Sequence, residues 1–291
     1  MKHYMLSKKI IVFTLISAFF LTISVSSIAQ GFGIYASPGI INYGGDLQKS
    51  VYTFSQARFA ISGGLLYNFN HFTIRGALTY GKIQGSDSTG GFKSRNLSFQ
   101  SKLGEASLAL QYDLFTLDEK KFTPYIFAGG ALFYHNPYTI YEGKRVNLRD
   151  LGTEGQGLSI YPDREMYSLT QFAIPLGVGV KYKITDHWHV AMEFCSRFLF
   201  SDYLDDVSKT YPDEAALLHG RGQLAVDLSY RGDEIDPTRT FPTEGAQRGS
   251  ASHNDNYYTS SLSIIYMFSR SESFGGIGRH KKMKALDCPK L

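Results

Sequence analysis

Two neighbouring stretches in the second half of the chain alternate between apolar and polar residues. In 171–183 every second residue is apolar, from Phe172 to Tyr182, and the residues between are small or polar. In 188–200 the apolar row runs from Trp188 to Phe200. A period of two is typical of β-strands whose two faces meet different surroundings. Because these aromatic rows lie opposite charged residues, the pattern predicts strands with lipid on one side and a polar lumen on the other.

Six further segments read as strands: 32–43, 58–68, 72–82, 97–114, 122–135 and 257–268. In 122–135 the faces cannot be assigned, because both rows are apolar. The connections alternate between tight turns and long loops. The turns are 68–71, 117–121 and 185–187, and the loops are 44–55, 84–94, 136–168 and 205–256. Single-chain outer-membrane barrels have an even number of strands, short periplasmic turns and long external loops. The sequence therefore predicts an all-β fold, an eight-stranded antiparallel transmembrane β-barrel with long loops over 30–269.

Composition agrees with a barrel and excludes other classes. Aromatic residues make up 14% of the chain, and charged residues make up 19%, below the roughly 25% of soluble domains. Two distant cysteines exclude a disulfide framework or a Cys-based zinc site. The net charge of +4 arises at the ends: the first 29 residues carry +3, the last 22 carry +4, and the body is acidic. Nucleic acid is therefore not an expected partner.

The first residues have the features of an export signal. Lys8 and Lys9 precede an apolar run over 10–25, and small residues at 27 and 29 suit cleavage before Gln30. The run is short for a spanning helix of about 20 residues. We therefore predict a signal peptide over 1–29.

The end of the last strand predicts where the chain is delivered. Tyr266-Met267-Phe268 resembles the C-terminal signal that outer-membrane barrel assembly machinery reads, and 23 residues follow it. We expect the protein in the outer membrane, in contact with its lipid. Both termini are then periplasmic, including a basic tail over 270–291.

An eight-stranded barrel is just wide enough to be filled by its own side chains. An unpaired charge in such an interior is costly, so we expect the inward charges to pair across the lumen. These charges are Arg58, Arg75, Glu105, Lys181, Glu193 and Arg197. This expectation disfavours an open pore and assigns function to the loops, turns and tail.

No catalytic, cofactor-binding or metal-binding residue is expected. His189 and Glu193 share a strand face, but Ser196 lies on the other, so a nucleophile–base–acid group does not form. His187 and His189 lack further metal ligands. The acidic run with Asp202, Asp205 and Asp206 is expected to be a solvated loop start rather than a hard-cation site. Neither Cys195, predicted to face the lumen, nor Cys288 in the tail has a plausible partner.

Several loop and strand-end segments resemble one family, the PorG-type outer-membrane barrels of the type IX secretion system. The most specific are Thr153-Glu154-Gly155-Gln156-Gly157, preceded by Leu151-Gly152, and Asp202-Tyr203-Leu204-Asp205-Asp206-Val207-Ser208. The others are Ser37 with Asn42 to Leu47, Arg95 to Phe99, Thr123 to Phe127, Arg248-Gly249-Ser250, Asn254-Asp255 and Cys288-Pro289. They occur in the family's order over nearly the whole mature chain.

The resemblance implies a non-enzymatic role in protein secretion. Similar proteins are needed to secrete cargo with a C-terminal sorting domain, in some bacteria also for gliding motility, and they associate with the periplasmic PorK/PorN ring. This chain would then tether the ring to the outer membrane. We predict that the basic tail contacts the ring through Arg279, His280, Lys281, Lys282 and Lys284. The alternatives are a passive small porin or ligand-binding outer-membrane barrel, and a lipid-modifying enzyme.

Two interpretations of the specific loop runs stay open. In the structural one, Thr153 to Gly157 form a tight hydrogen-bonded loop, and Asp205 or Asp206 caps a short helix through Ser208 and Tyr211. In the functional one, the runs contact another outer-membrane component of the type IX machinery.

Overall fold

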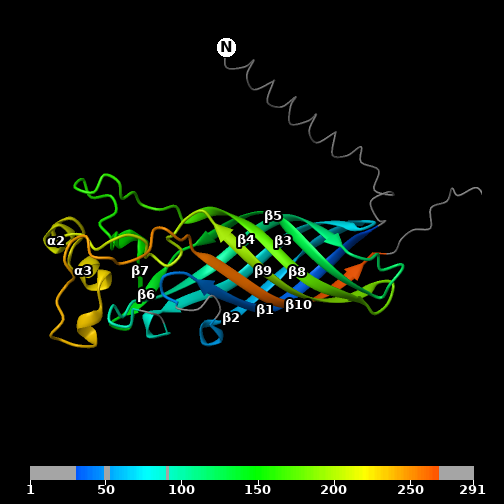
Figure 1. The fold of residues 1–291 in the computed structure, drawn as a ribbon, viewed down its shortest axis with the longest axis horizontal. Helices are drawn as coiled ribbons and strands as arrows, with labels where there is room; N and C mark the ends of the chain where they lie inside the picture. The colour runs from blue at the N-terminus through cyan, green and yellow to red at the C-terminus, as the bar shows by residue number, and fades with distance from the viewer. Residues whose placement is uncertain (1–30, 49–52, 90–91, 269–291) are drawn as a thin grey trace, which may run out of the picture. The chain divides into compact units, whose positions relative to one another are not determined.

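Eight long strands close into a ring (Figure 1). The computed structural model describes residues 31–48, 53–89 and 92–268. The strands are β1 Phe32–Gly44, β2 Arg58–Phe69, β3 Phe72–Ser86, β4 Ser98–Asp113, β5 Phe122–His135, β8 Thr170–Lys183, β9 Trp188–Leu199 and β10 Asn256–Met267. Each is antiparallel to its neighbours, and β10 pairs with β1 to close the ring. The predicted eight-stranded antiparallel barrel is confirmed.

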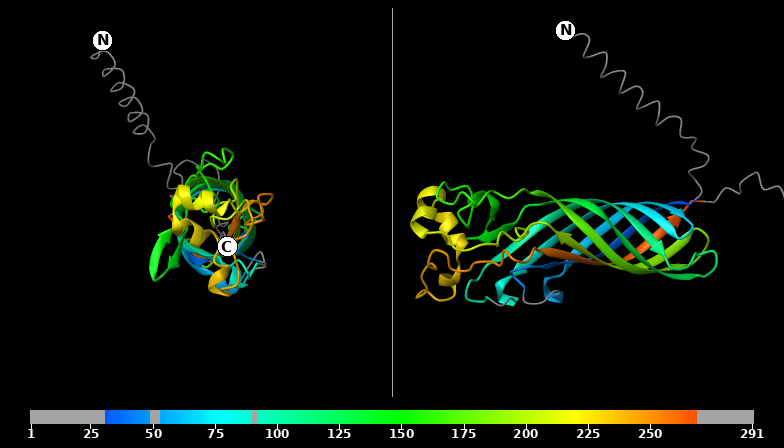
Figure 2. Two further views of the ribbon diagram at one scale, coloured as in Figure 1. Left: turned by 90° about the vertical axis from the view of Figure 1, so that its left-hand side faces the viewer. Right: turned by 45° about the horizontal axis from the view of Figure 1, so that its top comes forward.

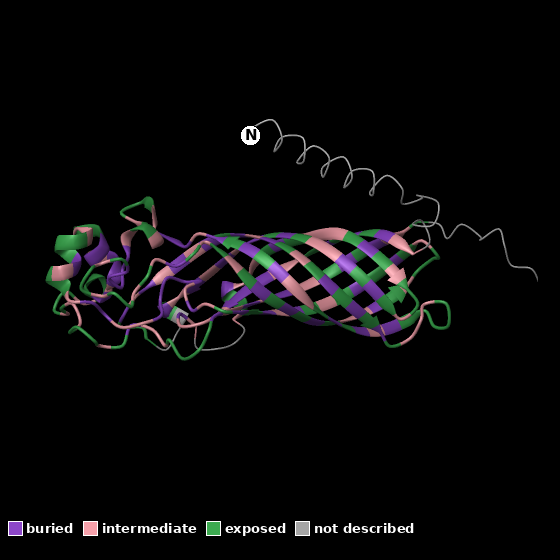
Figure 3. Cartoon of the chain, turned by 90° about the horizontal axis from the view of Figure 1, so that it is seen from above, coloured by how far each residue is buried: buried purple, intermediate pink, exposed green. Residues whose placement is uncertain are grey.

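The exterior of the barrel is apolar. Along each strand, buried and exposed residues alternate (Figure 3). Leu78 is 70% exposed, and Leu108 and Leu262 are each 64% exposed. So large an apolar surface is stable only in contact with lipid, where a closed barrel also satisfies its backbone hydrogen bonds.

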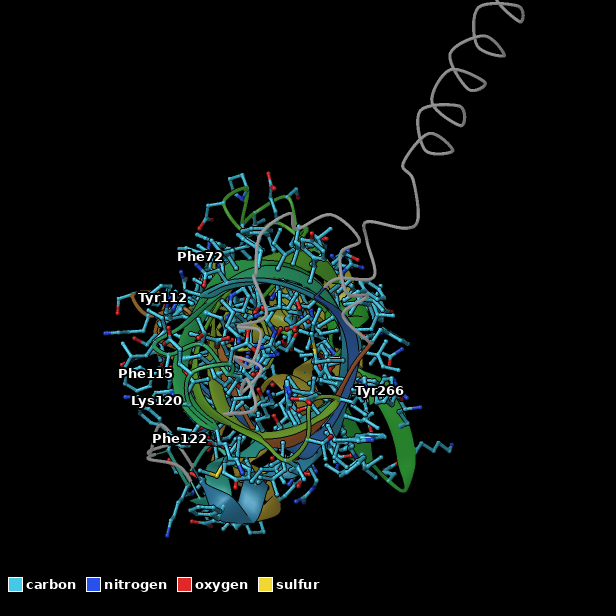
Figure 4. All side chains as sticks on the ribbon, turned by 90° about the vertical axis from the view of Figure 1, so that its right-hand side faces the viewer. Phe72, Tyr112, Phe115, Lys120, Phe122 and Tyr266 are labelled. Atoms are coloured by element: carbon cyan, nitrogen blue, oxygen red, sulfur yellow. The ribbon has the colours of Figure 1, made fainter. Side chains whose placement is uncertain are left out.

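Aromatic rings flank this apolar band at both ends. At the end of the tight turns the girdle contains Tyr67, Phe69, Phe72, Tyr112, Phe122, Tyr182 and Trp188, with Tyr266 half-buried beside them. Figure 4 looks onto this end and shows Phe72, Tyr112, Phe122 and Tyr266 around the outside of the wall. At the loop end the girdle contains Phe59, Tyr80, Tyr134, Phe172, Phe198 and Phe200. Two aromatic girdles on either side of an aliphatic band are typical of a membrane-spanning barrel.

The burial of side chains along β5 explains why the sequence did not indicate which face of this strand points inward. Tyr125, Phe127 and Phe133 are buried and face inward, whereas Ile126 and Leu132 face outward. The inward row is aromatic because it packs against buried apolar side chains inside the barrel. The strand therefore lacks the polar–apolar contrast that marks β8 and β9.

Three ion pairs occupy the lumen. Starting from the turn end, Lys181 Nζ lies 2.7 Å from Asp113. The next pair joins Arg75 Nη1 to Glu193 at 2.6 Å. The third pair lies nearest the loops and joins Arg197 Nε to Glu105 at 3.1 Å. All six side chains are buried to nine-tenths or more. The cavity between the second and third pairs holds only about 20 Å³, about the space of one water molecule.

Arg58 does not join these pairs. Its Nη1 donates to the backbone carbonyls of Ser55 and Ala57. Arg58 is the first residue of β2 and follows a short 3₁₀ helix, η2, at Phe54–Gln56. Backbone carbonyls therefore meet the guanidinium at the loop-end rim of the barrel.

The two longest loops contain short regular elements that sequence reasoning missed. A hairpin of β6 Tyr138–Tyr141 and β7 Lys144–Asn147 attaches to β4. Two helices, α2 Glu214–Arg221 and α3 Gln223–Ser229, lie in the last loop. Further single 3₁₀ turns are η3 Asp87–Thr89, η4 Arg149–Leu151 and η5 Gly232–Glu234. Strands of four residues and helices of two turns are too short to show a clear period. No helix in the described segments combines the length and hydropathy that crossing a membrane requires.

The predicted helix cap at Asp205 or Asp206 is wrong. No helix begins at these residues: the next helix, α2, starts at Glu214 and is capped by Asp213, whose Oδ1 accepts a hydrogen bond from Ala216 N at 2.8 Å. Asp206 has a φ of 71°, which is incompatible with the extended conformation of an N-cap. The signal peptide over 1–29 and the tail over 270–291 lie outside the described residues and stay predictions.

The loss of stability caused by a charge on the outer surface of the barrel should depend on how deep in the membrane that position lies. We expect Leu108→Lys, at mid-height on β4, to lower the free energy of unfolding from lipid vesicles by about 2–4 kcal/mol. Leu114→Lys continues the same row beyond Tyr112, and should cost about 0–1 kcal/mol. Denaturant titrations of both variants measure this, and equal losses would contradict a membrane-spanning band.

Candidate functional site

The loop segments that carry the family resemblance meet at the loop end of the barrel, whereas Thr123 to Phe127 begin β5 at the end with the tight turns and Cys288-Pro289 lies outside the described residues. They form a buried polar cluster, which we call the cap. Its members are Tyr43, Asp46, Asp87, Arg95, Thr153, Glu154, Asp202, Tyr203, Asp205, Asp206, Arg248 and Asp255. Glu154, Asp206 and Asp255 are fully buried, and Arg248 is 2% exposed. The loops that carry the cap gather at one end of the barrel in the right-hand view of Figure 2.

Glu154 and Arg248 form the centre of the cap. Arg248 Nη1 lies 2.9 Å from Glu154 Oε1. Glu154 also accepts hydrogen bonds from Tyr203 OH at 3.0 Å and from Ser208 N at 2.9 Å. The long loop between β5 and β8, the residues after β9 and the segment before β10 are therefore joined at one carboxylate. Hydrogen bonds to a charged group in a buried site are among the strong ones.

Asp206 adds a second junction. Its carboxylate accepts hydrogen bonds from Thr153 Oγ1 at 2.6 Å and from Tyr167 OH at 2.7 Å. Its carbonyl accepts from Arg248 Nη1 at 2.7 Å. Aspartate is one of the few non-glycine residues found at positive φ, and these bonds account for its conformation here.

Arg95 joins the first two loops to the same cluster. It donates two bonds to the Asp87 carboxylate, at 2.8 and 2.7 Å, and a third to the Asp46 carbonyl at 3.1 Å. It also donates to the backbone carbonyl of Arg248. Sequence analysis placed Arg95, Asp46 and Arg248 in family segments without a role, and it missed Asp87. Nothing in the spacing of an isolated loop aspartate could have identified it.

Two glycines of the family segments permit this close packing. Gly157 has a φ of 72°, a conformation that side chains disfavour. A Cβ on Gly249 would lie 2.6 Å from both Ser208 N and Asp46 Oδ2. These glycines are thus explained by the geometry of the cap.

The cap contains more carboxyl than guanidinium groups, and the pKa values of several of these carboxyl groups are raised. Burial, together with the carboxylates of Asp205 and Asp46, raises the pKa of Asp202 to about 9. Burial raises the pKa of Asp206 to about 6, although Arg248 opposes the shift. The pKa values of Asp205 and Asp255 are also raised by burial, and Tyr43 OH donates to the Asp205 carboxylate. Both carboxylate oxygens of Asp202 are buried without a hydrogen-bond partner.

An apolar layer lies between the cap and the lumen. Leu47, Leu97, Leu148, Leu204 and Leu228 come from the loops. They belong to one buried cluster with barrel side chains, which include Tyr43, Phe99, Phe133 and Tyr257. The loops are therefore packed into the mouth of the barrel.

The other sequence candidates lie apart from the cap. His187 Nδ1 is 3.0 Å from the Met267 carbonyl, while Nε2 of His189 is buried without a partner. Glu193 is paired with Arg75, and Ser196 is on the outward row. Within the described part of the chain, no three His, Cys, Asp or Glu residues are grouped so that they could hold a metal ion. Cys195 is buried, and Cys288 lies outside the described residues.

The cap arrangement favours the structural interpretation of the loop runs. Thr153, Glu154 and Gln156 are at most 1% exposed, and Asp205 and Asp206 are equally inaccessible. The predicted solvated loop start at Asp202, Asp205 and Asp206 is therefore wrong, because all three side chains are buried in the cap. Gly155 is buried between Glu154 and Gln156, and Tyr203 donates to Glu154. A partner docking on the outer surface cannot reach these buried side chains. These buried side chains of the two runs hold the loops together.

Removing the central guanidinium should open the cap but leave the barrel closed. Arg248→Met leaves Glu154 and Asp206 without their cation, a change that typically costs about 3–5 kcal/mol in a buried pair. We expect limited proteolysis to cut the loops of this variant at least tenfold faster, while heat-modifiable electrophoretic migration still reports a folded barrel. Arg239→Met is the control, because its ion pair with Asp236 is exposed and such pairs contribute about 0–1 kcal/mol. Loops that resist protease in both variants would refute the role of Arg248.

The cap should loosen as pH rises. Asp202 keeps its proton up to about pH 9 in the folded cap, whereas an exposed aspartate releases it near pH 4. Stability therefore falls through this window, since the closed state binds the extra proton. The measurement is the protection of amides 202–208 against hydrogen exchange between pH 5 and 8, corrected for intrinsic exchange rates. We expect this protection to fall less with pH in Asp202→Asn than in the wild type. Asp236→Asn, an exposed change in the same loop, should keep the wild-type slope. Identical slopes in all three proteins would rule out Asp202 as the source.

Solved structures with a similar fold are outer-membrane proteins. Neisserial surface protein A (NspA) is 12% identical with a TM-score of 0.44, covering 82% of this chain and 98% of that chain. Ail of Yersinia pestis is 8% identical with a TM-score of 0.40, covering 81% and 98%. OprG from Pseudomonas aeruginosa is 9% identical with a TM-score of 0.34, covering 82% and 97%. At such low identities these likenesses concern the fold alone.

Among curated proteins, none matches this sequence. A family model described as "Domain of unknown function (DUF6089)" matches residues 8–241. This range includes the first seven strands of the barrel, both helices and most of the cap. The chain therefore belongs to the DUF6089 family.

Proposed function

We propose that this protein is a non-enzymatic outer-membrane scaffold of the type IX secretion machinery. In this role the barrel anchors the protein in the outer membrane, and its periplasmic side holds the PorK/PorN ring. The proposal rests on the sequence resemblance together with the interior of the barrel. The family description itself names no function.

The filled interior is the observation that carries a scaffold role. Three buried ion pairs cross the lumen, and an apolar layer and the cap lie beyond them. In the described part of the barrel, these side chains occupy the space that a solute would need to cross the lumen. A protein whose interior is filled acts through its surfaces, which supports a scaffold over a porin.

The orientation of the strands supports a periplasmic role for the tail. Gly33 at the start of β1 pairs with Met267 at the end of β10, so the tail is attached at the end with the tight turns. In outer-membrane barrels, tight turns face the periplasm. The tail residues Arg279, His280, Lys281, Lys282 and Lys284 lie outside the described residues, and their contact with the ring is part of the proposal.

One observation keeps a ligand-binding barrel as the second candidate. An open groove at the loop end is lined by Tyr167, Phe172, Phe200, Tyr203 and Lys209. It mixes aromatic rings with polar groups, as ligand sites do. The groove lies on the outer side of the loops, so a ligand there would not enter the lumen.

Removing the tail charges should release the ring. We expect Arg279→Gln/Lys281→Gln/Lys282→Gln/Lys284→Gln to recover at least fivefold less PorK and PorN when the tagged protein is purified from outer membranes in mild detergent. The reason is that an acidic docking surface loses four attractive charges. A chain that stops after Ser271 should behave in the same way.

The matched control is Lys120→Gln/Lys121→Gln, which removes neighbouring charges from the turn between β4 and β5 at the same end. Both residues are exposed, and this variant should keep the ring. Full recovery of the ring by the tail variant would overturn the tail contact. Absence of ring proteins from the wild-type sample would overturn the type IX role itself.

A further inference from the structure

A pair of lysines interrupts the apolar outward surface near the loop end. The outward row of β3 runs through Leu78 and Tyr80 to Lys82. On the neighbouring strand β4, Lys102 is the register partner of Lys82. Lys102 is exposed and Lys82 is half-buried. Like charges directly opposite each other on adjacent strands destabilise a sheet, so this pair needs a compensating anion or a functional reason.

A third cation joins the pair from the β6–β7 hairpin. Arg145 lies over the Tyr138 ring at 3.9 Å from its centroid, and Lys82 Nζ is 6.0 Å from the same centroid. Tyr138 OH donates to Gln100 Oε1 at 3.1 Å, which fixes the ring on the outward face of β4. Two cations thus share one aromatic ring, and Lys102 follows two residues after Gln100.

No carboxylate neutralises this cluster within the described ranges. The salt bridges there, of which the closest to the hairpin joins Arg231 to Glu234, do not include Lys82, Lys102 or Arg145. Besides Tyr138, Arg145 has a long side-chain contact of 3.4 Å to Asn147. The three charges are therefore available to an external anion.

The height of the cluster identifies that anion. Lys82 lies two residues beyond Tyr80 of the loop-end girdle, a rise of roughly 7 Å along the strand. Aromatic girdles mark the boundary between acyl chains and headgroups, so the cluster lies at the level of the headgroups. Ile140, 48% exposed on the hairpin, is on the same face as Arg145. Apolar groups below and beside three cations suit a lipid better than a soluble anion.

We propose that Lys82, Lys102 and Arg145 bind the phosphate groups of a phosphorylated glycolipid in the leaflet around the loops. The site is continuous with the lipid-facing surface, and its charge complements a lipid phosphate. Tyr80 and Leu78 lie where the acyl chains of the same lipid would pack. The proposal rests on the proposed outer-membrane placement but not on a role in secretion. It gives the hairpin a task, which is to hold a lipid against the wall of the barrel.

The test uses the purified full-length protein and two forms of one lipid. Native mass spectrometry compares the retention of lipid A carrying its phosphates with that of the same lipid A after dephosphorylation. The wild type should retain the phosphorylated form preferentially. In Lys82→Gln/Lys102→Gln this preference should be about tenfold weaker than in the wild type, since each basic residue near an anionic lipid contributes measurably to binding. Arg145→Gln, on a hairpin outside the barrel wall, should lose part of it without affecting barrel assembly.

The control is Lys120→Gln/Lys121→Gln, which removes the same charge at the opposite end of the barrel and should keep the wild-type preference. Equal retention of both lipid forms by the wild type would overturn the proposal. Wild-type preference in both the double lysine variant and Arg145→Gln would also overturn it. Because ring proteins are absent from this assay, either result leaves the type IX proposal to its own experiment.

Discussion

The width of an eight-stranded ring is the constraint on which the rest of this structure depends. Closure pairs the backbone groups along the wall, as lipid requires, but it leaves a lumen that side chains fill. Every charge that points inward must then find a partner within the lumen. Arg75 pairs with Glu193 and Arg197 with Glu105 across the barrel, and the charged inward rows are stable only because both partners are present.

The cap applies the same principle to the loops. More than 90 residues after Glu154 in the chain, Arg248 reaches its carboxylate, so two loops are fixed by one buried pair. The excess of carboxylates around that pair costs stability at neutral pH. The apolar layer below compensates, because loop leucines such as Leu204 and Leu228 are buried with barrel residues such as Phe133. These contacts offset the conformational entropy that ordering such long loops costs.

The barrel could be predicted from the sequence because each outward row has the same simple pattern. The apolar positions of β8 and β9 contrast with Lys181, Glu193 and Arg197, and this contrast follows from the difference between lipid and lumen. Where both faces are apolar, as in β5, the pattern does not indicate which face points into the lumen. The pairing of Glu154 with Arg248 could not be predicted, because no local spacing links them. The family resemblance indicated that both segments matter, but their joint role became visible only in three dimensions.

The two ends of the barrel present different chemistry. At the loop end most motif side chains are buried, and the exposed charges include Lys102 on the outer wall and Arg145 on the hairpin. At the turn end, Figure 4 shows Phe115 and Lys120 on the turn between β4 and β5, with Lys120 Nζ 3.7 Å from the Phe115 ring centroid. The rigid wall between the ends keeps both surfaces at a fixed distance on opposite sides of the bilayer. A rigid link of this kind suits a protein that anchors an assembly, because a load applied at one end is carried by the whole barrel rather than by a flexible loop.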